Sequence, residues 1–310
     1  MPAPDAVLLL AYGGPVRPEE IRPFLDGVLR GKRVPRERYE AVVRHYEEVG
    51  GASPLLPITL RQAAGLAAIL RRDGPDLPVR VGMRHWHPFV ADTLAGMTRE
   101  GIRHAAGIIL APHASEASRE SYLRAVEEGR ARIGGSAPEI AFAASWHEHP
   151  LFIETLADRL AGTLEGVPAE RRGDAVVIFT AHSIPVPMDR ASGYSAQVTR
   201  TAELVARRAG LRGWRIAYQS RSGGPADPWL GPDLTVLLRE LGRDGARDAI
   251  VVPAGFVADH VEVLWDLDID ARAAAQEAGL RFHRAPTAGD HPAFLRLLAE
   301  LVRGLCGTPA

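Results

Sequence analysis

The chain has 310 residues, 46% of them hydrophobic and 24% charged, a composition typical of a globular protein of about two domains. Its formal net charge of -1 at pH 7 gives no indication of a nucleic-acid or anionic-membrane partner. The single cysteine, Cys306, excludes a disulfide within the chain, a cysteine-ligated iron–sulfur cluster and a cysteine-based zinc site.

Short apolar runs alternate with amphipathic segments along the whole chain. The runs predicted to be strands of a first half are residues 6–12, 79–84, 106–112 and 140–145. The runs predicted to be strands of a second half are residues 176–182, 214–220, 249–255 and 280–286. Helical periodicity between these runs predicts helices at residues 58–72, 91–101, 120–133 and 195–210.

The predicted strands are apolar throughout, and helices separate them, which indicates parallel sheets covered on both faces. Eight such strands could close one barrel, but the chain length and the helical region inserted at residues 17–50 favour two open sheets. We therefore predict an α/β fold of two Rossmann-like, doubly wound domains, residues 1–150 and 151–310, with a cleft between them. The C-terminal helix, residues 290–304, is expected to pack on the first domain.

Polar residues at the ends of the predicted strands are candidates for a site, because ligands of such sheets bind outside the carboxyl ends of the strands. A histidine at one strand end is usually a hydrogen-bonded packing residue. Several at one sheet edge, near acidic residues, indicate a site that handles cations or protons. The strand-end residues are Tyr12, His85, His113, His182, Gln219 and Ser220, followed by the turn DHVE at residues 259–262.

The segment VPAGFVADHVEVLWDLDID, residues 252–270, carries a column of carboxylates. Asp259, Glu262, Asp266 and Asp270 are three or four residues apart, so on one helix they would share a face. Like charges at this spacing disfavour a helix by a few tenths of a kcal/mol per pair. A solvated face is the simplest explanation of the pattern, and a cation or proton pathway is the alternative.

Five blocks of sequence together resemble one enzyme family. They are LLAYGGP (9–15), YEEVGGASPL (46–55), TAHSIP (180–185), QSRSGGPADPWLGPD (219–233) and GFVADHVEVLWDLD (255–268). In this order they resemble the ferrochelatases, most closely the bacterial coproporphyrin III ferrochelatases. The fingerprints of dinucleotide-binding proteins, P-loop NTPases and α/β-hydrolases are absent from the sequence.

The resemblance implies insertion of Fe²⁺ into coproporphyrin III to give coprohaem in haem biosynthesis, with release of two pyrrole protons and no cofactor beyond the substrate Fe²⁺. It assigns catalysis to His182 of the AHS-x-P motif and Glu262 of the DH-x-E motif. An imidazole can accept a proton or bind iron, and a carboxylate favours the cation and shuttles protons. The acidic ladder of the family matches Glu262, Asp266 and Asp270, which with His182 are the expected metal ligands, on a helix with local π-type winding.

The resemblance also implies a set of porphyrin contacts. Tyr12 matches a tyrosine that can be a weak axial ligand to the product iron, and His85 matches a wall of the site. The four propionates of coproporphyrin need polar partners, for which the matching positions are Arg30, His45, Tyr46, Ser53 and Tyr122. His45 replaces an arginine of relatives, and another such arginine falls on Leu29. The basic stretch at residues 28–46, in place of a hydrophobic lip, favours coproporphyrin over protoporphyrin.

Other functions remain as alternatives: a protoporphyrin IX ferrochelatase, a chelatase for sirohydrochlorin or cobalt precorrins, or a porphyrin or haem carrier without activity. The expected partners are coproporphyrin III, Fe²⁺ and, transiently, a downstream coprohaem decarboxylase, and the expected state is a monomer. No apolar run approaches the roughly 18 residues of a membrane span. The N-terminal sequence lacks the basic region of a signal peptide, so we expect a cytoplasmic protein.

Overall fold

The computed structural model describes residues 2–223 and 227–307. Residues 224–226, which belong to the block at 219–233, lie outside the described residues. The chain divides into two compact units. The first unit holds the residues up to Ala111, Ala117–Ser145 and the part from Gly289 onward, and the second holds Pro112–Glu116 and Trp146–Ala288.

The sheet of the first unit has four parallel strands in the order β2-β1-β3-β4. They are β1 (Ala6–Ala11), β2 (Val79–Met83), β3 (His104–Ile109) and β4 (Glu139–Phe142). Every residue of β1 is buried, as expected for a central strand of a sheet that is covered on both faces.

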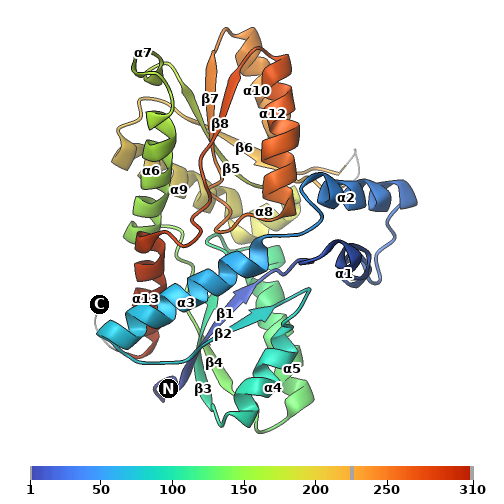
Figure 1. Cartoon of the computed structure of the whole chain (residues 1–310), viewed down its shortest axis with the longest axis vertical. Coiled ribbons are helices and arrows are strands. Elements are labelled where there is room, and N and C mark those ends of the chain that lie inside the picture. Colours follow the sequence, from blue (N-terminus) through green and yellow to red (C-terminus); the bar gives the residue numbers. More distant parts are fainter. Residues whose placement is uncertain (1, 224–226, 308–310) are drawn as a thin grey trace. The chain divides into compact units, whose positions relative to one another are not determined.

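Helices cover both faces of this sheet. Side chains of α4 (Val90–Arg99) and α5 (Ser121–Ile133) form one core with β1 and β3. On the other face, α3 (Leu55–Asp73) packs on β2, and α13 (Pro292–Leu305) packs on β3 and α3. The helices α1 (Ile21–Val28) and α2 (Arg36–Glu48) contact each other, and the basic stretch runs from the end of α1 into α2. Figure 1 labels these elements.

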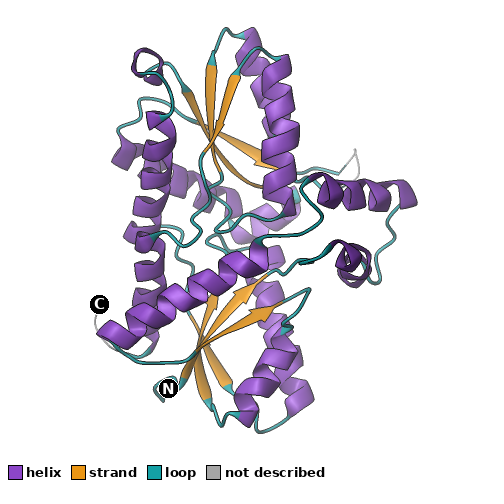
Figure 2. Ribbon diagram, in the orientation of Figure 1, coloured by secondary structure: helices purple, strands orange, loops and turns teal. Residues whose placement is uncertain are grey.

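The sheet of the second unit repeats the plan, with four parallel strands in the order β6-β5-β7-β8. They are β5 (Val176–His182), β6 (Arg215–Gln219), β7 (Asp248–Val252) and β8 (Arg281–Arg284). Figure 2 shows the strands of each sheet side by side with helices around them. Two parallel, doubly wound sheets confirm the predicted α/β fold class, and all eight expected strands are present.

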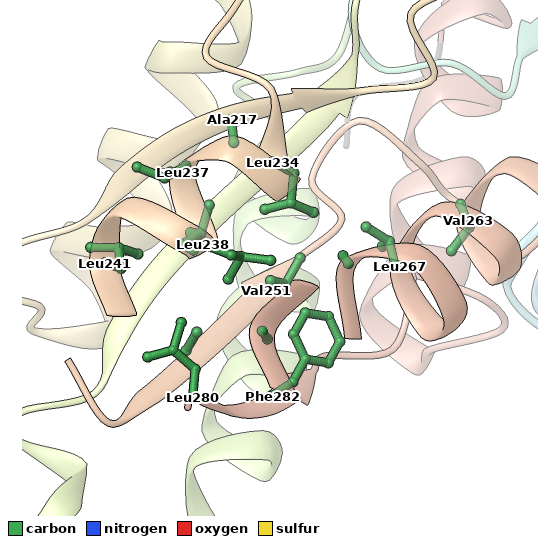
Figure 3. Close-up of a cluster of buried hydrophobic side chains, with 14 of the residues drawn as sticks. Ala217, Leu234, Leu237, Leu238, Leu241, Val251, Val263, Leu267, Leu280 and Phe282 are labelled. Atoms are coloured by element: carbon green, nitrogen blue, oxygen red, sulfur yellow. The ribbon is translucent and has the colours of Figure 1, made fainter. Parts of the chain in front are cut away.

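One hydrophobic core of the second unit lies between its sheet and the helices α10 (Leu234–Arg243) and α12 (Arg272–Glu277) (Figure 3). Leucines of α10 recur at helical spacing and meet Val251 of β7 and Phe282 of β8. Asp233 begins α10, because its side chain accepts hydrogen bonds from the backbone amides of Thr235 and Val236. The opposite face is covered by α6 (Pro150–Glu165), which packs on β7, and by α9 (Tyr194–Ala209).

The remaining elements are short. They are η1 (Pro18–Glu20), η2 (Glu116–Glu120), α7 (Ala169–Arg172), α8 (Val186–Ser192), α11 (Val261–Val263) and η3 (Leu264–Ala271). Within the described residues, no helix combines the length and the apolar character needed to cross a membrane.

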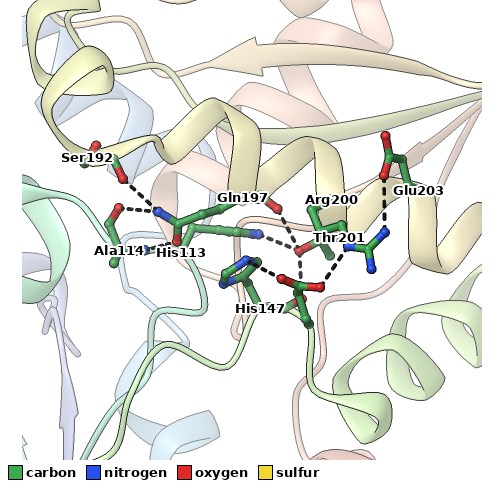
Figure 4. A network of polar contacts seen from close by, with 9 residues as sticks. His113, Ala114, His147, Ser192, Gln197, Arg200, Thr201 and Glu203 are labelled. Carbon is green, nitrogen blue, oxygen red and sulfur yellow. Dashed lines mark hydrogen bonds and ion pairs between the residues drawn. The ribbon is translucent and has the colours of Figure 1, made fainter.

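A polar network ties residues 112–116 to α9 within the second unit (Figure 4). The Gln197 amide accepts from the backbone N–H of Ala114 at 2.8 Å and donates to its carbonyl at 3.1 Å. His113, flagged as a strand-end residue, is buried, and its Nε2 lies 2.9 Å from Thr201 Oγ1. Burial lowers the pKa of His113 to about 3, so the ring is neutral at pH 7. We interpret His113 as a packing residue.

Candidate active site

His182 and Glu262 lie next to each other in the second unit. His182 is the last residue of β5, and its Nε2 is 3.6 Å from Glu262 Oε2 on α11. The two side chains are 31% and 45% exposed, so both are accessible to small molecules. Residues that are 80 positions apart in the sequence therefore form one pair at the carboxyl end of the sheet, where ligands of this fold class bind.

The turn after β7 brings Glu262 to this place. Gly255 donates its N–H to the Thr180 carbonyl at 3.0 Å, and a Cβ at Gly255 would lie only 2.8 Å from the Cα of Ala181. Only glycine allows the turn to approach β5 so closely. His260 then begins α11, because its Nδ1 accepts the N–H of Glu262 at 3.2 Å. Glu262 is thereby held in the first helical turn, beside the end of β5.

The tautomer of His182 follows from its hydrogen bond. The Nδ1 atom contacts the backbone carbonyl of Ser183. A carbonyl only accepts, so Nδ1 carries the hydrogen. In the neutral ring Nε2 is then the nitrogen with a free lone pair, and it faces Glu262. This nitrogen can accept a proton or bind a metal ion.

The charges of the pair reinforce each other. Burial lowers the pKa of His182, but the charge and hydrogen bond of Glu262, the Ser183 carbonyl and the charge of Asp266 together outweigh burial, and the net shift of that pKa is upward. Burial raises the pKa of Glu262, but the positive charge and hydrogen bond of His182 outweigh it and lower that pKa to about 2. A proton accepted by His182 is therefore stabilised by the carboxylate that faces it.

Asp266 is a carboxyl group with a raised pKa beside this pair. Burial, and then repulsion by Glu262, raise the pKa of Asp266 to about 7. Two side chains at the end of β6 contact it: Gln219 Nε2 lies 3.4 Å from Asp266 Oδ2, and the Ser220 hydroxyl donates to the same oxygen. Gln219 also donates to the Glu262 carbonyl at 3.0 Å. A carboxyl group that titrates near neutral pH can take up and release protons under working conditions.

Ser220 has an unusual backbone. Its φ is +60°, the single positive φ of a non-glycine residue in the part of the chain that the structure describes. Such a conformation costs of order 1–3 kcal/mol and is concentrated at functional sites. The sequence flags Gln219 and Ser220 only as strand-end residues, and the structure adds their contacts with Asp266.

The expectation that all four carboxylates share one helix face is wrong for Asp259. The helix begins after His260, so Asp259 lies before it and instead binds Arg284 Nη1 at 3.2 Å. The helix then continues as the π-helix η3, which carries Asp266, Asp268 and Asp270. The sequence pattern could not reveal where the helix starts, because that depends on the cap supplied by His260.

Asp270 lies in a different electrostatic environment from the pair. Burial raises the pKa of Asp270, and the next influence is repulsion by Asp233. Across residues 2–223 and 227–307, no group of three or more His, Cys, Asp or Glu side chains forms a metal site. The expected ligand set of His182, Glu262, Asp266 and Asp270 stays a prediction: the first three interact, and Asp270 is perturbed by other neighbours.

In the first unit, Tyr12 and Tyr122 are linked by an arginine that the sequence analysis did not single out. Arg84 follows β2, and its guanidinium carbon lies 5.7 Å from the centroids of both tyrosine rings. Tyr12 is 42% exposed, and Tyr122 is buried, which raises its pKa. Arg84 also donates to the Ala117 carbonyl at 3.1 Å. The one sequence signal for Arg84 is its place at a strand end, before His85.

The rings of His85 and Tyr12 contact each other at a tilt of 49°, with their centroids 4.5 Å apart. Burial, and then the charges of Arg84 and Lys32, lower the pKa of His85 to about 4, so the ring is neutral at pH 7. Its Nε2 atom is buried with no hydrogen-bond partner among the described residues. This edge of the first sheet therefore presents an exposed phenol beside a neutral imidazole.

The four other predicted porphyrin contacts differ in exposure. Arg30 is exposed just after α1, and His45 is half-buried on α2, where burial lowers its pKa. Tyr46 is 3% exposed, with its ring edge-on to Phe24 at 6.0 Å, and Ser53 is also buried. The structure therefore buries Tyr46 and Ser53 within the first unit, and their role in porphyrin binding stays a prediction.

The ferrochelatase family model matches residues 4–305. The chain belongs to the ferrochelatase family. The coproporphyrin III ferrochelatase of Nocardia farcinica is 43% identical over 309 residues, which cover 97% of this chain and 88% of the relative. That of Mycolicibacterium smegmatis is 43% identical over 301 residues, which cover 96% and 88%. The identification made from the sequence blocks is confirmed.

Two solved structures share the fold of this ferrochelatase-family chain. The sirohydrochlorin chelatase SirB from Bacillus subtilis subspecies spizizenii aligns with a TM-score of 0.56 at 12% identity and covers 97% of this chain and 95% of its own. The multi-domain protein DR2241 from Deinococcus radiodurans aligns with a TM-score of 0.59 at 16% identity, over 99% of this chain and 56% of its own. At these identities the likeness supports the fold alone.

Proposed function

We propose that this ferrochelatase-family chain inserts Fe²⁺ into coproporphyrin III, yielding Fe-coproporphyrin III and two protons in haem biosynthesis. The observation that carries the proposal is the contact of 3.6 Å between His182 Nε2 and Glu262 Oε2, both partly exposed at a strand end. The similarity to proteins named coproporphyrin III ferrochelatases, at 43% identity over most of both chains, supports this choice of porphyrin.

The proton chemistry follows from the pair. Two pyrrole N–H protons must leave before a divalent ion can occupy the four ring nitrogens. His182 Nε2 has one lone pair, so it accepts the two pyrrole protons one after the other, and while it holds a proton the Glu262 carboxylate is the group that can hold the ion. The Glu262 carboxylate stabilises the imidazolium that forms when His182 accepts a proton. Asp266, with its pKa near 7, can then receive the proton and release it to water.

Fe²⁺ enters this scheme as a substrate. Imidazole nitrogen and carboxylate oxygen are suitable ligands for it. His182, Glu262 and Asp266 are proposed to pass the ion to the porphyrin, with Asp270 further along the π-helix. Carboxylates that do not close around the ion suit transfer, because an ion held by a complete ligand shell would not be released to the macrocycle.

The porphyrin contacts proposed in the first unit are Tyr12, His85 and Tyr122, with Arg30, His45, Tyr46 and Ser53 as partners of the propionates. Exposed Tyr12 can present its hydroxyl to the ring centre. We also propose that the chain acts as a monomer in the cytoplasm, needs no cofactor beyond Fe²⁺, and passes its product to a coprohaem decarboxylase.

The test is an anaerobic reaction of the protein with coproporphyrin III and Fe²⁺, followed by visible absorption. The free-base bands should give way to those of the metalloporphyrin, and His182→Ala should bind the porphyrin but not metallate it. Binding without metallation by the wild-type protein would contradict the proposal and indicate a carrier. Faster turnover of protoporphyrin IX in a parallel reaction would overturn the choice of coproporphyrin.

A further inference from the structure

Arg284, the last residue of β8, joins two carboxylates on either side of the candidate site. Its Nε and Nη2 donate to the two oxygens of Asp268 at 2.8 and 2.9 Å, and its Nη1 donates to Asp259 Oδ1 at 3.2 Å. The arginine is 14% exposed, so its contacts are shielded from water. Thr287 adds a hydrogen bond to Asp259 at 3.1 Å.

The two carboxylates bracket the segment that carries the site. Asp259 comes three residues before Glu262, and Asp268 comes two residues after Asp266. One guanidinium therefore fixes both ends of a stretch of chain whose middle holds both acidic groups. Gln219 and Ser220, at the end of β6, contact the same segment through Asp266 and the Glu262 carbonyl. The segment is held by two different strands of the sheet.

This support matters because of the winding of the segment. The π-helix is a rare conformation, so tertiary contacts must hold it in place of the α-helix. Like charges on Glu262 and Asp266 oppose its formation further. The side-chain contacts with β6 and β8 stabilise it. Of these, the bidentate pair of Arg284 and Asp268 has the strongest geometry.

We infer that Arg284 is a positioning residue for metal insertion: it fixes the turn at Asp259 and the π-helix at Asp268 so that Glu262 and Asp266 keep their places beside His182. The inference rests on the proposed function. Only arginine suits the role, because its planar guanidinium group binds both oxygens of one carboxylate and still donates an N–H to a second carboxylate. A lysine would keep the charge and lose this geometry.

Arg281 provides a matched control on the same strand. It forms a bidentate pair with the buried Asp248, at 2.9 and 2.9 Å, at the opposite end of β8. Arg281→Met therefore removes a pair of the same type from the same strand. Asp248 keeps contacts with Arg171 and His283, so its charge stays partnered in this variant.

The test compares Arg284→Met, Arg284→Lys and Arg281→Met by amide hydrogen exchange without metal and by steady-state metal insertion. Arg284→Met should exchange faster across residues 259–271 and lose about 10–100-fold in kcat, the scale of a small misplacement of catalytic groups. Its KM for the porphyrin should be unchanged, and Arg284→Lys should be intermediate. Arg281→Met should lower the melting temperature and leave kcat and that exchange unchanged.

The inference would be overturned if Arg284→Met had the same amide exchange and the same kcat as the wild-type protein. Equal losses of kcat in Arg284→Met and Arg281→Met would also overturn it. If Arg284→Met does not fold, Asp268→Asn tests the same contact and should reproduce the slower turnover. When Arg284→Lys is already present, adding Asp268→Asn should lower kcat by a smaller factor than Asp268→Asn does alone. The effects of substituting two residues in contact are not additive. Absence of metal insertion by the wild-type protein would refute the proposed function, while the exchange comparison would still decide the role of Arg284.

Discussion

Removing the charge of Asp266 should change how the stability of the protein depends on pH. In the folded chain the pKa of Asp266 is raised to about 7 from its ordinary value of 3.8, first by burial and then by Glu262. The folded state therefore binds this proton more tightly than the unfolded chain does. The resulting stabilisation is complete below pH 3.8 and is lost as the pH rises through about 7. Asp266→Asn, which cannot ionise, lacks this loss.

The size of the effect follows from the shift. Each pH unit between the two pKa values changes the free energy of unfolding by at most about 1.4 kcal/mol, so the interval from pH 5 to pH 7 gives at most about 2.7 kcal/mol. Asp266 is only partly buried, and solvent screening reduces this to about 1–2 kcal/mol. Between pH 5 and pH 7, the free energy of unfolding of Asp266→Asn should therefore rise by this amount relative to that of the wild-type protein.

The assay is urea unfolding of both proteins at pH 5, 6, 7 and 8, in buffer with a chelator and followed by circular dichroism. Asp92→Asn, which removes an exposed carboxyl group of α4, controls for the loss of one negative charge. A stability difference between Asp266→Asn and the wild type that stays constant from pH 5 to pH 8 would refute the reasoning. The folded chain would then bind the Asp266 proton no more tightly than the unfolded chain does.

Three further predictions concern the same site. Glu262→Gln should lower the pKa of His182, since the carboxylate that raises it is removed; a histidine NMR titration that shows no decrease would contradict this. Gly255→Ala should cost about 1–3 kcal/mol of stability and reduce metal insertion, because its Cβ would overlap the end of β5; thermal unfolding and turnover equal to the wild type would argue against it. Ser220→Ala should raise the pKa of Asp266 further, because a hydrogen bond to the charged form is lost; an unaltered pH dependence of unfolding would exclude that contact.

Much of the site could be predicted from the sequence because its main groups stand at strand ends. His182 follows an apolar run whose composition predicts a buried strand, and parallel strands end at one edge of their sheet. The acidic pattern around Glu262 is likewise visible in the sequence. Motif order was enough to identify the family, which the family model confirms over residues 4–305.

The contacts of long side chains could not be predicted in this way. Arg84, between two tyrosine rings, and Arg284, between two aspartates, have no sequence pattern that separates them from exposed arginines. The burial of Tyr46 and Ser53 could not be predicted from the sequence either, since it depends on how α2 and the following turn pack. Such partners are set by distances in the folded chain between residues far apart in the sequence.

By itself, the sequence determined the α/β class, the eight strands and the residues at their ends, because apolar runs and helical periodicity are local properties of the chain. Only the tertiary structure decided the contacts and the electrostatic surroundings of each carboxylate. It turned Asp259 toward Arg284, placed Glu262 beside His182 and raised the pKa of Asp266 to about 7. The physical reason is that the pKa of a carboxyl group depends on its burial and on the charges around it, and both arise only when distant segments pack together.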